Sequence, residues 1–279
     1  MAYTPLQLAE AFIQTGEVQD ALDALNQHLD ANPADDAARR LRAQVLMRLR
    51  DEDSLRAALA DLEQISNKTA SDYLTKVIVL EQLHDFEAAL NTAADLHRQF
   101  PADEQIAERC FWLLMGQRHF AAAAQLLSVM PLTSDWLSKA GHLATEDGHE
   151  DQAPGYFTQA LDHLAQEFDL ASDAFAKPIH ANLLVSRAQA YANLSRFPEA
   201  DNDYKAAQAV MPDDPLIPFW GAFVVAELGR TNEAIDLWRS TLAAADGKWF
   251  KTMMIENLKA LADQPKFARL AALLDSATP

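Results

Sequence analysis

The sequence predicts an all-α protein in which about sixteen short helices follow one another as pairs. Glycine is scarce, at 8 of 279 residues, whereas Ala, Leu, Glu and Gln, which all favour helices, are abundant. Apolar residues recur at helical spacing in short stretches that turn residues interrupt. The pattern returns at intervals close to 34 residues along most of the chain, as in a repeat array.

The clearest helix pair spans residues 183–212, LLVSRAQAYANLSRFPEADNDYKAAQAVMP. Small or apolar residues lie on one face of each helix, namely Leu184, Ala188 and Tyr191 on the first and Ala200, Tyr204 and Ala207 on the second. Pro198 suits the first turn of the second helix. Pro212 ends the pair, because proline cannot donate the hydrogen bond that a continuing helix needs.

This stretch resembles the tetratricopeptide repeat (TPR), a helix–turn–helix unit with small, aromatic and proline landmarks. The six matching landmarks are Ala188, Tyr191, Ala200, Tyr204, Ala207 and Pro212. The resemblance implies a right-handed superhelical solenoid of antiparallel helix pairs, in which the first helix of each pair lines a concave groove. It also implies that the protein binds partners in that groove.

The first four repeats cover residues 5–33, 36–66, 70–101 and 104–131. The segment TGEVQDAL at 15–22 is close to the TPR pattern, and Pro33 and Pro101 close the first and third repeats. The second repeat is weaker, because Leu55 replaces the small residue that opens its second helix and no proline closes it. We therefore expect it to be among the first places to open. Pro131 comes early in the fourth repeat.

The remaining repeats cover residues 134–165, 181–212 and 215–244. Residues 166–180 interrupt the register and are expected to lengthen the preceding helix and then form a loop. This insertion could act as a hinge between two sub-arrays, although no Gly/Ser linker marks independent domains. The predicted organisation is 1–165 for repeats one to five, 166–180 for the insertion, 181–247 for repeats six and seven, and 248–279 for C-terminal capping helices.

The charge balance favours protein partners over nucleic acid. Lys and Arg number 23 and Asp and Glu 41, which gives a net charge of −18 and an isoelectric point near 4.7. Such a chain repels nucleic acid and anionic lipid, so we expect neutral or basic partners. No run approaches 18 uninterrupted apolar residues, so no membrane insertion is expected. The opening MAYTPLQLAEAF lacks the basic region and apolar core of a signal peptide, and a cytoplasmic location is expected. Cys110 is the one cysteine, so an internal disulfide is excluded.

No motif of catalysis or of cofactor binding is found in the sequence. Neither phosphate-binding glycine motif occurs, and His149-Glu150 lacks the second histidine of the helical zinc motif. The acidic residues Glu146, Asp147, Glu150 and Asp151 flank Gly148 without the alternation of a calcium loop, which indicates a solvated turn. We therefore predict a non-catalytic protein with no metal and no cofactor.

Register with the TPR family identifies the residues expected to face the groove and bind a partner. These are Arg40, Gln44, Arg48, Ile78, Trp112, Met115, His142, Gln189, Asn193, Phe219 and Phe223. The aromatic residues among them could anchor a partner or could pack against neighbouring helices. Gln189 and Asn193 could bind a peptide backbone or be solvated, and His142 is expected to be a surface or groove residue rather than a catalyst.

Arg40, Gln44 and Arg48 form a basic line along one helix, with Arg39, Arg42 and Arg50 beside it. The line could accept a carboxylate of a partner. The alternative is that these arginines pair with nearby acidic residues, namely Asp35, Asp36, Asp51, Glu52 and Asp53. Some TPR proteins grip acidic chaperone tails, but Leu6 and Glu10 occupy groove positions where cationic or amide groups would be needed. We therefore do not predict such a clamp.

The sequence as a whole predicts a protein-interaction scaffold or adaptor that binds a peptide segment or a folded partner in the groove. A chaperone or assembly factor that shields an apolar client segment is the first alternative. A sensor whose superhelix changes pitch on binding a small peptide is the second. An enzyme is the least favoured reading, and the sequence does not predict an oligomeric state.

Overall fold

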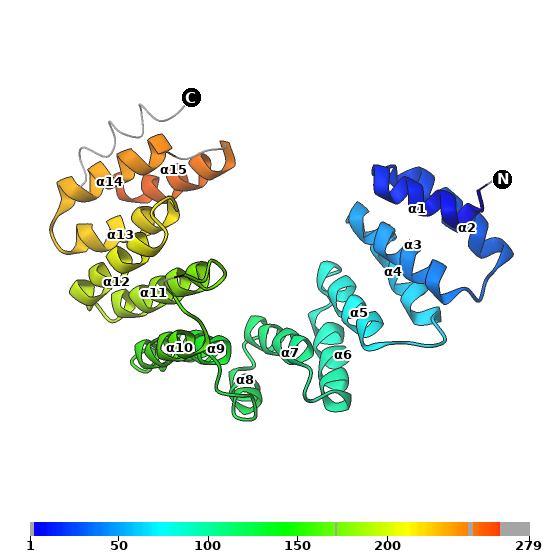
Figure 1. Cartoon of the computed structure of the whole chain (residues 1–279), viewed down its shortest axis with the longest axis horizontal. Helices are drawn as coiled ribbons and strands as arrows, with labels where there is room; N and C mark the ends of the chain where they lie inside the picture. Colours follow the sequence, from blue (N-terminus) through cyan, green and yellow to red (C-terminus); the bar gives the residue numbers. More distant parts are fainter. Residues whose placement is uncertain (1–2, 171, 245–247, 263–279) are drawn as a thin grey trace. The chain divides into compact units, whose positions relative to one another are not determined.

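The computed structural model describes residues 3–170, 172–244 and 248–262, and within these ranges it contains fifteen α-helices and no strand (Figure 1). In chain order they are α1 Pro5–Thr15, α2 Val18–Ala31, α3 Asp36–Leu49, α4 Glu52–Gln64, α5 Ala70–Gln82, α6 Phe86–Gln99, α7 Glu104–Gly116, α8 Phe120–Leu127, α9 Ser134–Glu146, α10 Ala153–Glu167, α11 Ala176–Asn193, α12 Phe197–Val210, α13 Leu216–Glu227, α14 Thr231–Ala244 and α15 Lys248–Ala262. The all-α prediction is confirmed. None of these described helices combines the length and the apolar character needed to cross a bilayer.

The chain divides into two compact units, an N-terminal unit of residues 1–126 and a C-terminal unit of residues 127–279. From α1 to α7 in the first, and from α9 to α14 in the second, each helix packs against the helices before and after it. Such neighbour-to-neighbour packing is characteristic of stacked repeats. The division falls at residues 126 and 127, not in the segment 166–180 that the sequence suggests as a hinge.

Local sequence signals set the helix ends in the N-terminal unit. Thr4 and Gln7 form a reciprocal capping box at the start of α1, and Gly16 ends that helix with a left-handed φ of 84°. Thr69 and Asp72 form the same kind of box at the start of α5. Each box satisfies backbone N–H groups that have no partner within the helix, so the start of the helix is fixed.

Alanines allow the paired helices of the N-terminal unit to approach closely. Ala21, Ala43 and Ala58 are fully buried where α1 to α4 meet. Leu55, the residue expected to weaken the second repeat, is itself buried in a cluster with Ala43 and Ala58. The larger side chain therefore contributes to the core, while the order in which the repeats open stays a prediction.

The inserted segment lengthens the helix after it more than the helix before it. α10 has 15 residues, close to the 14 of α12, whereas α11 has 18 and begins at Ala176. Oδ1 of Asp173 accepts hydrogen bonds from the backbone N of Phe175 at 2.8 Å and of Ala176 at 3.3 Å. This carboxylate starts a new helix early, because it supplies an acceptor to N–H groups at the helix start.

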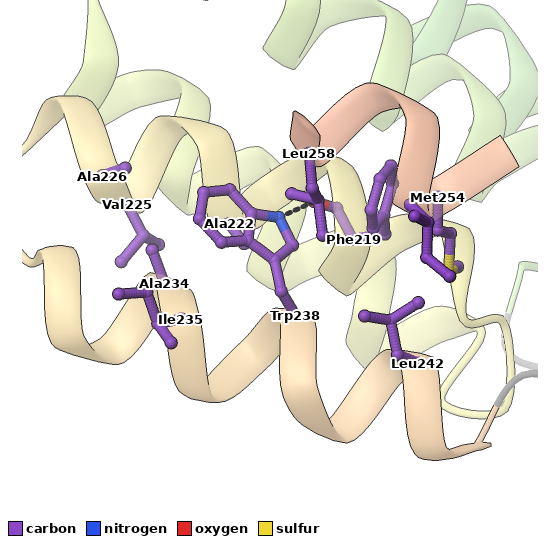
Figure 2. Close-up of a cluster of buried hydrophobic side chains, with 11 residues drawn as sticks. Phe219, Ala222, Val225, Ala226, Ala234, Ile235, Trp238, Leu242, Met254 and Leu258 are labelled. Atoms are coloured by element: carbon purple, nitrogen blue, oxygen red, sulfur yellow. Dashed lines mark hydrogen bonds between the residues drawn. The ribbon is translucent and has the colours of Figure 1, made fainter. Parts of the chain in front are cut away.

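The last part of the described chain packs into one core, which Figure 2 shows. Trp238 of α14 is fully buried, and its Nε1 donates a hydrogen bond to the backbone O of Phe219 on α13 at 3.1 Å. α15 adds Met254 and Leu258, so it covers the apolar face of the preceding pair. The part of the predicted capping region 248–279 that follows residue 262 lies outside the described residues.

Candidate partner-binding face

Three first helices of the N-terminal unit carry side chains at one shared register position. Gln44 on α3, Ile78 on α5 and Trp112 on α7 follow one another at the repeat interval. Gln44 and Trp112 are exposed and Ile78 is half-buried. We call this the first-helix face. Beside it Nη1 of Arg109 on α7 lies 3.1 Å from Oε2 of Glu81 on α5, which joins the two helices.

The first-helix face contains a surface cavity between α3 and α5, which we call the α3–α5 pocket. Its volume is about 460 Å³, and it is lined by Gln44, Met47, Arg48, Arg50, Thr75, Ile78 and Gln82. This size lies in the range of ligand-binding pockets. Of the candidates predicted from sequence, the structure brings Gln44, Arg48 and Ile78 together in this pocket.

Arg40, the first residue of the predicted basic line, is held in an ion pair. Its Nε lies 2.7 Å from Oδ1 of Asp72 and its Nη2 lies 2.9 Å from Oδ2, and Nη2 also donates to the backbone O of Asn67 at 2.8 Å. Burial alone would raise the pKa of Asp72, but hydrogen bonds from Arg40 and Thr69 outweigh it, so the pKa lies below its ordinary value. Arg40 therefore joins α3 to α5 in this structure.

The acidic residues near α3 form no ion pair with the basic line, and Asp36 and Arg40 interact only through their charges at longer range. Asp35 caps α3 and lies 2.8 Å from Nε2 of His28. Asp36 accepts backbone hydrogen bonds from Ser66 and Asn67, which lower the pKa of its carboxyl group. Arg40 and Arg42 pair instead with carboxylates farther along the chain, since Arg40 contacts Asp72 and Arg42 contacts Asp61 at 2.6 Å through Nη2 and Oδ1.

The other arginines of this region, Arg48 and Arg50, differ from Arg40 in their surroundings. Both are exposed and line the α3–α5 pocket. Neither guanidinium has an ion pair or a hydrogen bond with any residue that the structure describes. Two cations therefore remain available to an anion that enters the pocket.

The pocket also contains Thr75 and Gln82, which are not among the residues predicted from the sequence. Gln82 follows Arg48 at the repeat interval, and this spacing alone would have identified Gln82 as a candidate from the sequence. Its Oε1 is buried and accepts no hydrogen bond from any residue within the described ranges. Thr75 donates from Oγ1 to the backbone O of Ser71 at 2.8 Å. Arg50, which the sequence places beside the basic line, follows α3 directly and has a left-handed φ of 60°.

On α7, Trp112 and Met115 extend the first-helix face. Trp112 is 44% exposed, although its ring packs edge-on against Phe111 at a centroid distance of 5.1 Å. Its Nε1 donates to Oε1 of Glu108 at 3.4 Å, and Met115 is half-buried. A large indole with this much exposed surface can contact a partner, so the structure leaves this prediction open to test.

Three candidates lie on α9 and α11 of the C-terminal unit. His142 is half-buried and packs edge-on against Phe157 at 5.2 Å, and burial followed by the charge of Lys139 lowers its pKa below the ordinary value. Gln189 hydrogen-bonds the hydroxyl of Tyr204, while burial raises the pKa of Tyr204 to about 12. Asn193 is exposed. Partner binding by these residues stays a prediction.

Phe219 corrects the sequence-based assignment. Its side chain is fully buried among residues of α13, α14 and α15, so it cannot contact a partner in this structure (Figure 2). Phe223 is half-buried, stacks on Trp220 at 5.6 Å and lies edge-on to Trp238 at 5.1 Å. It also lines a small cavity of about 140 Å³ in the C-terminal unit. Substitution of Phe223 would therefore disturb the core as well as the surface.

Among the described residues, no group of His, Cys, Asp and Glu is arranged as a metal site. Cys110 is buried, and burial raises the pKa of its thiol to about 11, so it is protonated and unreactive near neutral pH.

The fold is similar to that of solved tetratricopeptide repeat proteins. A TPR protein from Parabacteroides merdae matches with a TM-score of 0.63 at 14% identity, over 90% of this chain and 96% of that chain. The C-terminal part of a TPR repeat-containing protein from Cytophaga hutchinsonii matches with a TM-score of 0.60 at 15% identity, over 90% and 98%. Yeast Tom70 matches with a TM-score of 0.55 at 14% identity, over 90% of this chain and 61% of Tom70.

No protein-family model matches the sequence, and no curated protein matches it either. At the identities of the structural matches, similarity shows the fold alone. It confirms the TPR-like array of helix pairs that the sequence predicts.

Proposed function

We propose that the chain is a non-catalytic protein-interaction scaffold or adaptor that binds a peptide segment or a folded partner on its first-helix face. The α3–α5 pocket carries this proposal, because it combines a cavity of about 460 Å³ with two arginines that have no partner among the described residues. The exposed indole of Trp112 supplies a second contact at the same register position as Ile78.

The fold supports binding in general. Stacked helix pairs hold a long row of side chains on a rigid surface, and repeat proteins use such surfaces to bind partners. The single cysteine is buried and forms no disulfide, as is common in reducing compartments, and we propose that the binding occurs in the cytoplasm.

The two alternative functions differ from the scaffold in what would be measured. A chaperone or assembly factor would form transient complexes that depend on the presence of an unfolded or unassembled client. A sensor would change its dimensions when a peptide binds, which small-angle X-ray scattering detects. A scaffold would form stable complexes and keep its dimensions.

Affinity purification from native lysate followed by quantitative mass spectrometry tests the proposal. The wild-type chain is compared with Trp112→Ala and with Trp249→Ala, a matched control in which the replaced indole is 78% exposed on α15. We expect a set of proteins that wild type and Trp249→Ala retain and that Trp112→Ala loses. Equal recovery by all three proteins would show that binding does not need Trp112 and would move the binding surface away from α7. Circular dichroism of each variant shows whether helical content is retained.

A further inference from the structure

We propose that the α3–α5 pocket binds an extended peptide segment in which an Asp or Glu side chain lies next to an aliphatic one. The inference rests on the proposed function, and it names the partner chemistry of the same site. The charge of the pocket, the hydrogen-bonding state of Gln82 and the apolar walls each contribute to it.

Charge is the first observation. Six arginines of the N-terminal unit contact a carboxylate, namely Arg39, Arg40, Arg42, Arg56, Arg98 and Arg109. Among the described residues Arg48, Arg50 and Arg118 have no such contact, although the chain has a net charge of −18, and Arg118 lies instead over the ring of Phe120. Arg48 and Arg50 both line one pocket, where a planar guanidinium can donate two hydrogen bonds to one carboxylate. The pocket is therefore complementary to an acidic side chain.

The carboxamide of Gln82 is the second observation. Gln82 lines the pocket, but its Oε1 is buried with no donor from the described part of the chain. A buried acceptor without a donor destabilises the unbound protein. Gln82 lines the pocket and the terminal torsion of glutamine is broad and roughly two-fold, so the proposal includes a rotation of this amide that presents Oε1 to a bound peptide. A backbone N–H of an extended peptide would then satisfy it, which gives the pocket a preference for a peptide over a simple anion.

The walls of the pocket are the third observation. Met47 and Ile78 are half-buried and contribute apolar surface, while Gln44 and Thr75 contribute polar atoms. An aliphatic side chain beside the carboxylate would remove that apolar surface from water. These apolar walls suit a carboxylate beside an aliphatic side chain better than they suit a doubly charged phosphate.

The acidic character of the whole chain does not oppose this assignment. Exposed charges more than about 8 Å apart are largely screened at physiological ionic strength. Arg48 and Arg50 are the charged residues among those that line the pocket, so the general expectation of neutral or basic partners does not apply to the segment that enters it.

The test begins with a phage-displayed library of random dodecapeptides selected on the immobilised full chain. We expect enriched sequences to contain Asp or Glu next to Leu, Ile, Val or Met. Synthetic copies of the enriched peptides are then titrated by fluorescence anisotropy against wild type, Arg48→Gln/Arg50→Gln and Arg56→Gln/Arg98→Gln. The second double variant is the matched control, since it removes the same charge from exposed side chains of α4 and α6.

Replacing Arg48 and Arg50 should weaken binding at least about tenfold, because hydrogen bonds to charged groups are lost. The control variant should bind within roughly twofold of wild type, since exposed ion pairs contribute little. A peptide with its acidic residue changed to Asn or Gln should lose affinity for the unmodified protein. This last measurement tests the proposal without any change to the fold.

Several outcomes would overturn the proposal. They are an absence of enriched peptides, enrichment without acidic residues, affinity that does not depend on Arg48 and Arg50, and tighter binding of a phosphoserine copy than of the acidic peptide. Peptides that bind elsewhere would refute the pocket assignment and leave the scaffold function standing. Failure of the scaffold function itself would appear separately, as a lysate experiment in which the wild-type chain recovers no protein above a resin-only control.

Discussion

The backbone of α9 approaches α10 so closely that a Cβ atom on Gly141 would lie 2.7 Å from Cζ of Phe157. Phe157 is itself almost fully buried, so its ring has little room to move. Gly141→Ala should therefore destabilise the protein by roughly 1–3 kcal/mol through overpacking. Urea unfolding followed by circular dichroism measures the change.

Gly155→Ala on α10 is the matched control for Gly141→Ala. A Cβ at Gly155 meets no atom within 4 Å, and alanine favours helix over glycine. This variant should be as stable as wild type or slightly more stable. An equal loss of stability in both variants would show that the close contact of Gly141 with Phe157 is not the cause.

Ala200 marks a second close approach, between α11 and α12. It is fully buried in a cluster with Ala188 and Tyr204. Ala200→Leu should destabilise the protein by roughly 1–3 kcal/mol, because three additional carbon atoms have no space. Ala206→Leu on the exposed side of the same helix should change stability by less than about 0.5 kcal/mol. Unchanged melting of Ala200→Leu would contradict the packing register.

The helix pairs were predictable because local signals mark them. Proline at position 198, the capping residues Thr4 and Thr69 and the small residues Ala188 and Ala200 all act within a few residues of their own helix. Since each repeat contacts only its neighbours, local signals suffice for most of such an array.

The pairing of Arg40 was not predictable in that way. The acidic residues considered from sequence lie within a few positions of α3, whereas Asp72 lies 32 residues away. Stacking of successive repeats brings residues at nearly the same register together, so the partner of an arginine can belong to the next repeat. The candidate basic line consequently separates into a paired Arg40 and the pocket residues Arg48 and Arg50.

Phe219 and Phe223 show that the repeat register does not by itself predict which residues are buried. One helical turn separates them, yet Phe219 is fully buried and Phe223 only half-buried. α15 carries none of the repeat landmarks, but its Met254 and Leu258 complete the core around Phe219. A pattern defined by internal repeats does not predict which residues a terminal helix covers.

The ion pair of Asp72 with Arg40 makes stability depend on pH. The pKa of Asp72 in the folded chain lies below its ordinary value of 3.8, because hydrogen bonds to its charged form outweigh burial. A depressed pKa contributes stability that is fully present above the unfolded pKa and is lost as pH falls through the folded pKa. Asp72→Asn should therefore cost roughly 3 kcal/mol near neutral pH and progressively less on acidification below about pH 4.

Urea unfolding of wild type and Asp72→Asn between neutral and acidic pH measures this dependence. Asp95→Asn is a suitable control, since its pair with Arg98 is exposed and should contribute less than about 1 kcal/mol. The difference in stability between wild type and Asp72→Asn could also stay constant down to the lowest pH measured. That result would show that ionisation of Asp72 does not cause the pH dependence.

The carboxamide of Gln82 should oppose stability and support binding. Its buried Oε1 has no donor among the described residues, and Met has a similar length without polar atoms. Gln82→Met should therefore raise the free energy of unfolding by about 1 kcal/mol. If the amide accepts a peptide N–H, the same change should weaken binding of the selected acidic peptides by roughly three- to tenfold.

Gln27→Met, at an exposed position of α2, should leave both quantities unchanged. A substitution that raises the stability of the protein and lowers its affinity for the peptide identifies a residue that serves recognition at the expense of folding. A stabilised Gln82→Met variant with full affinity would mean that the peptide reaches Arg48 and Arg50 without using this amide.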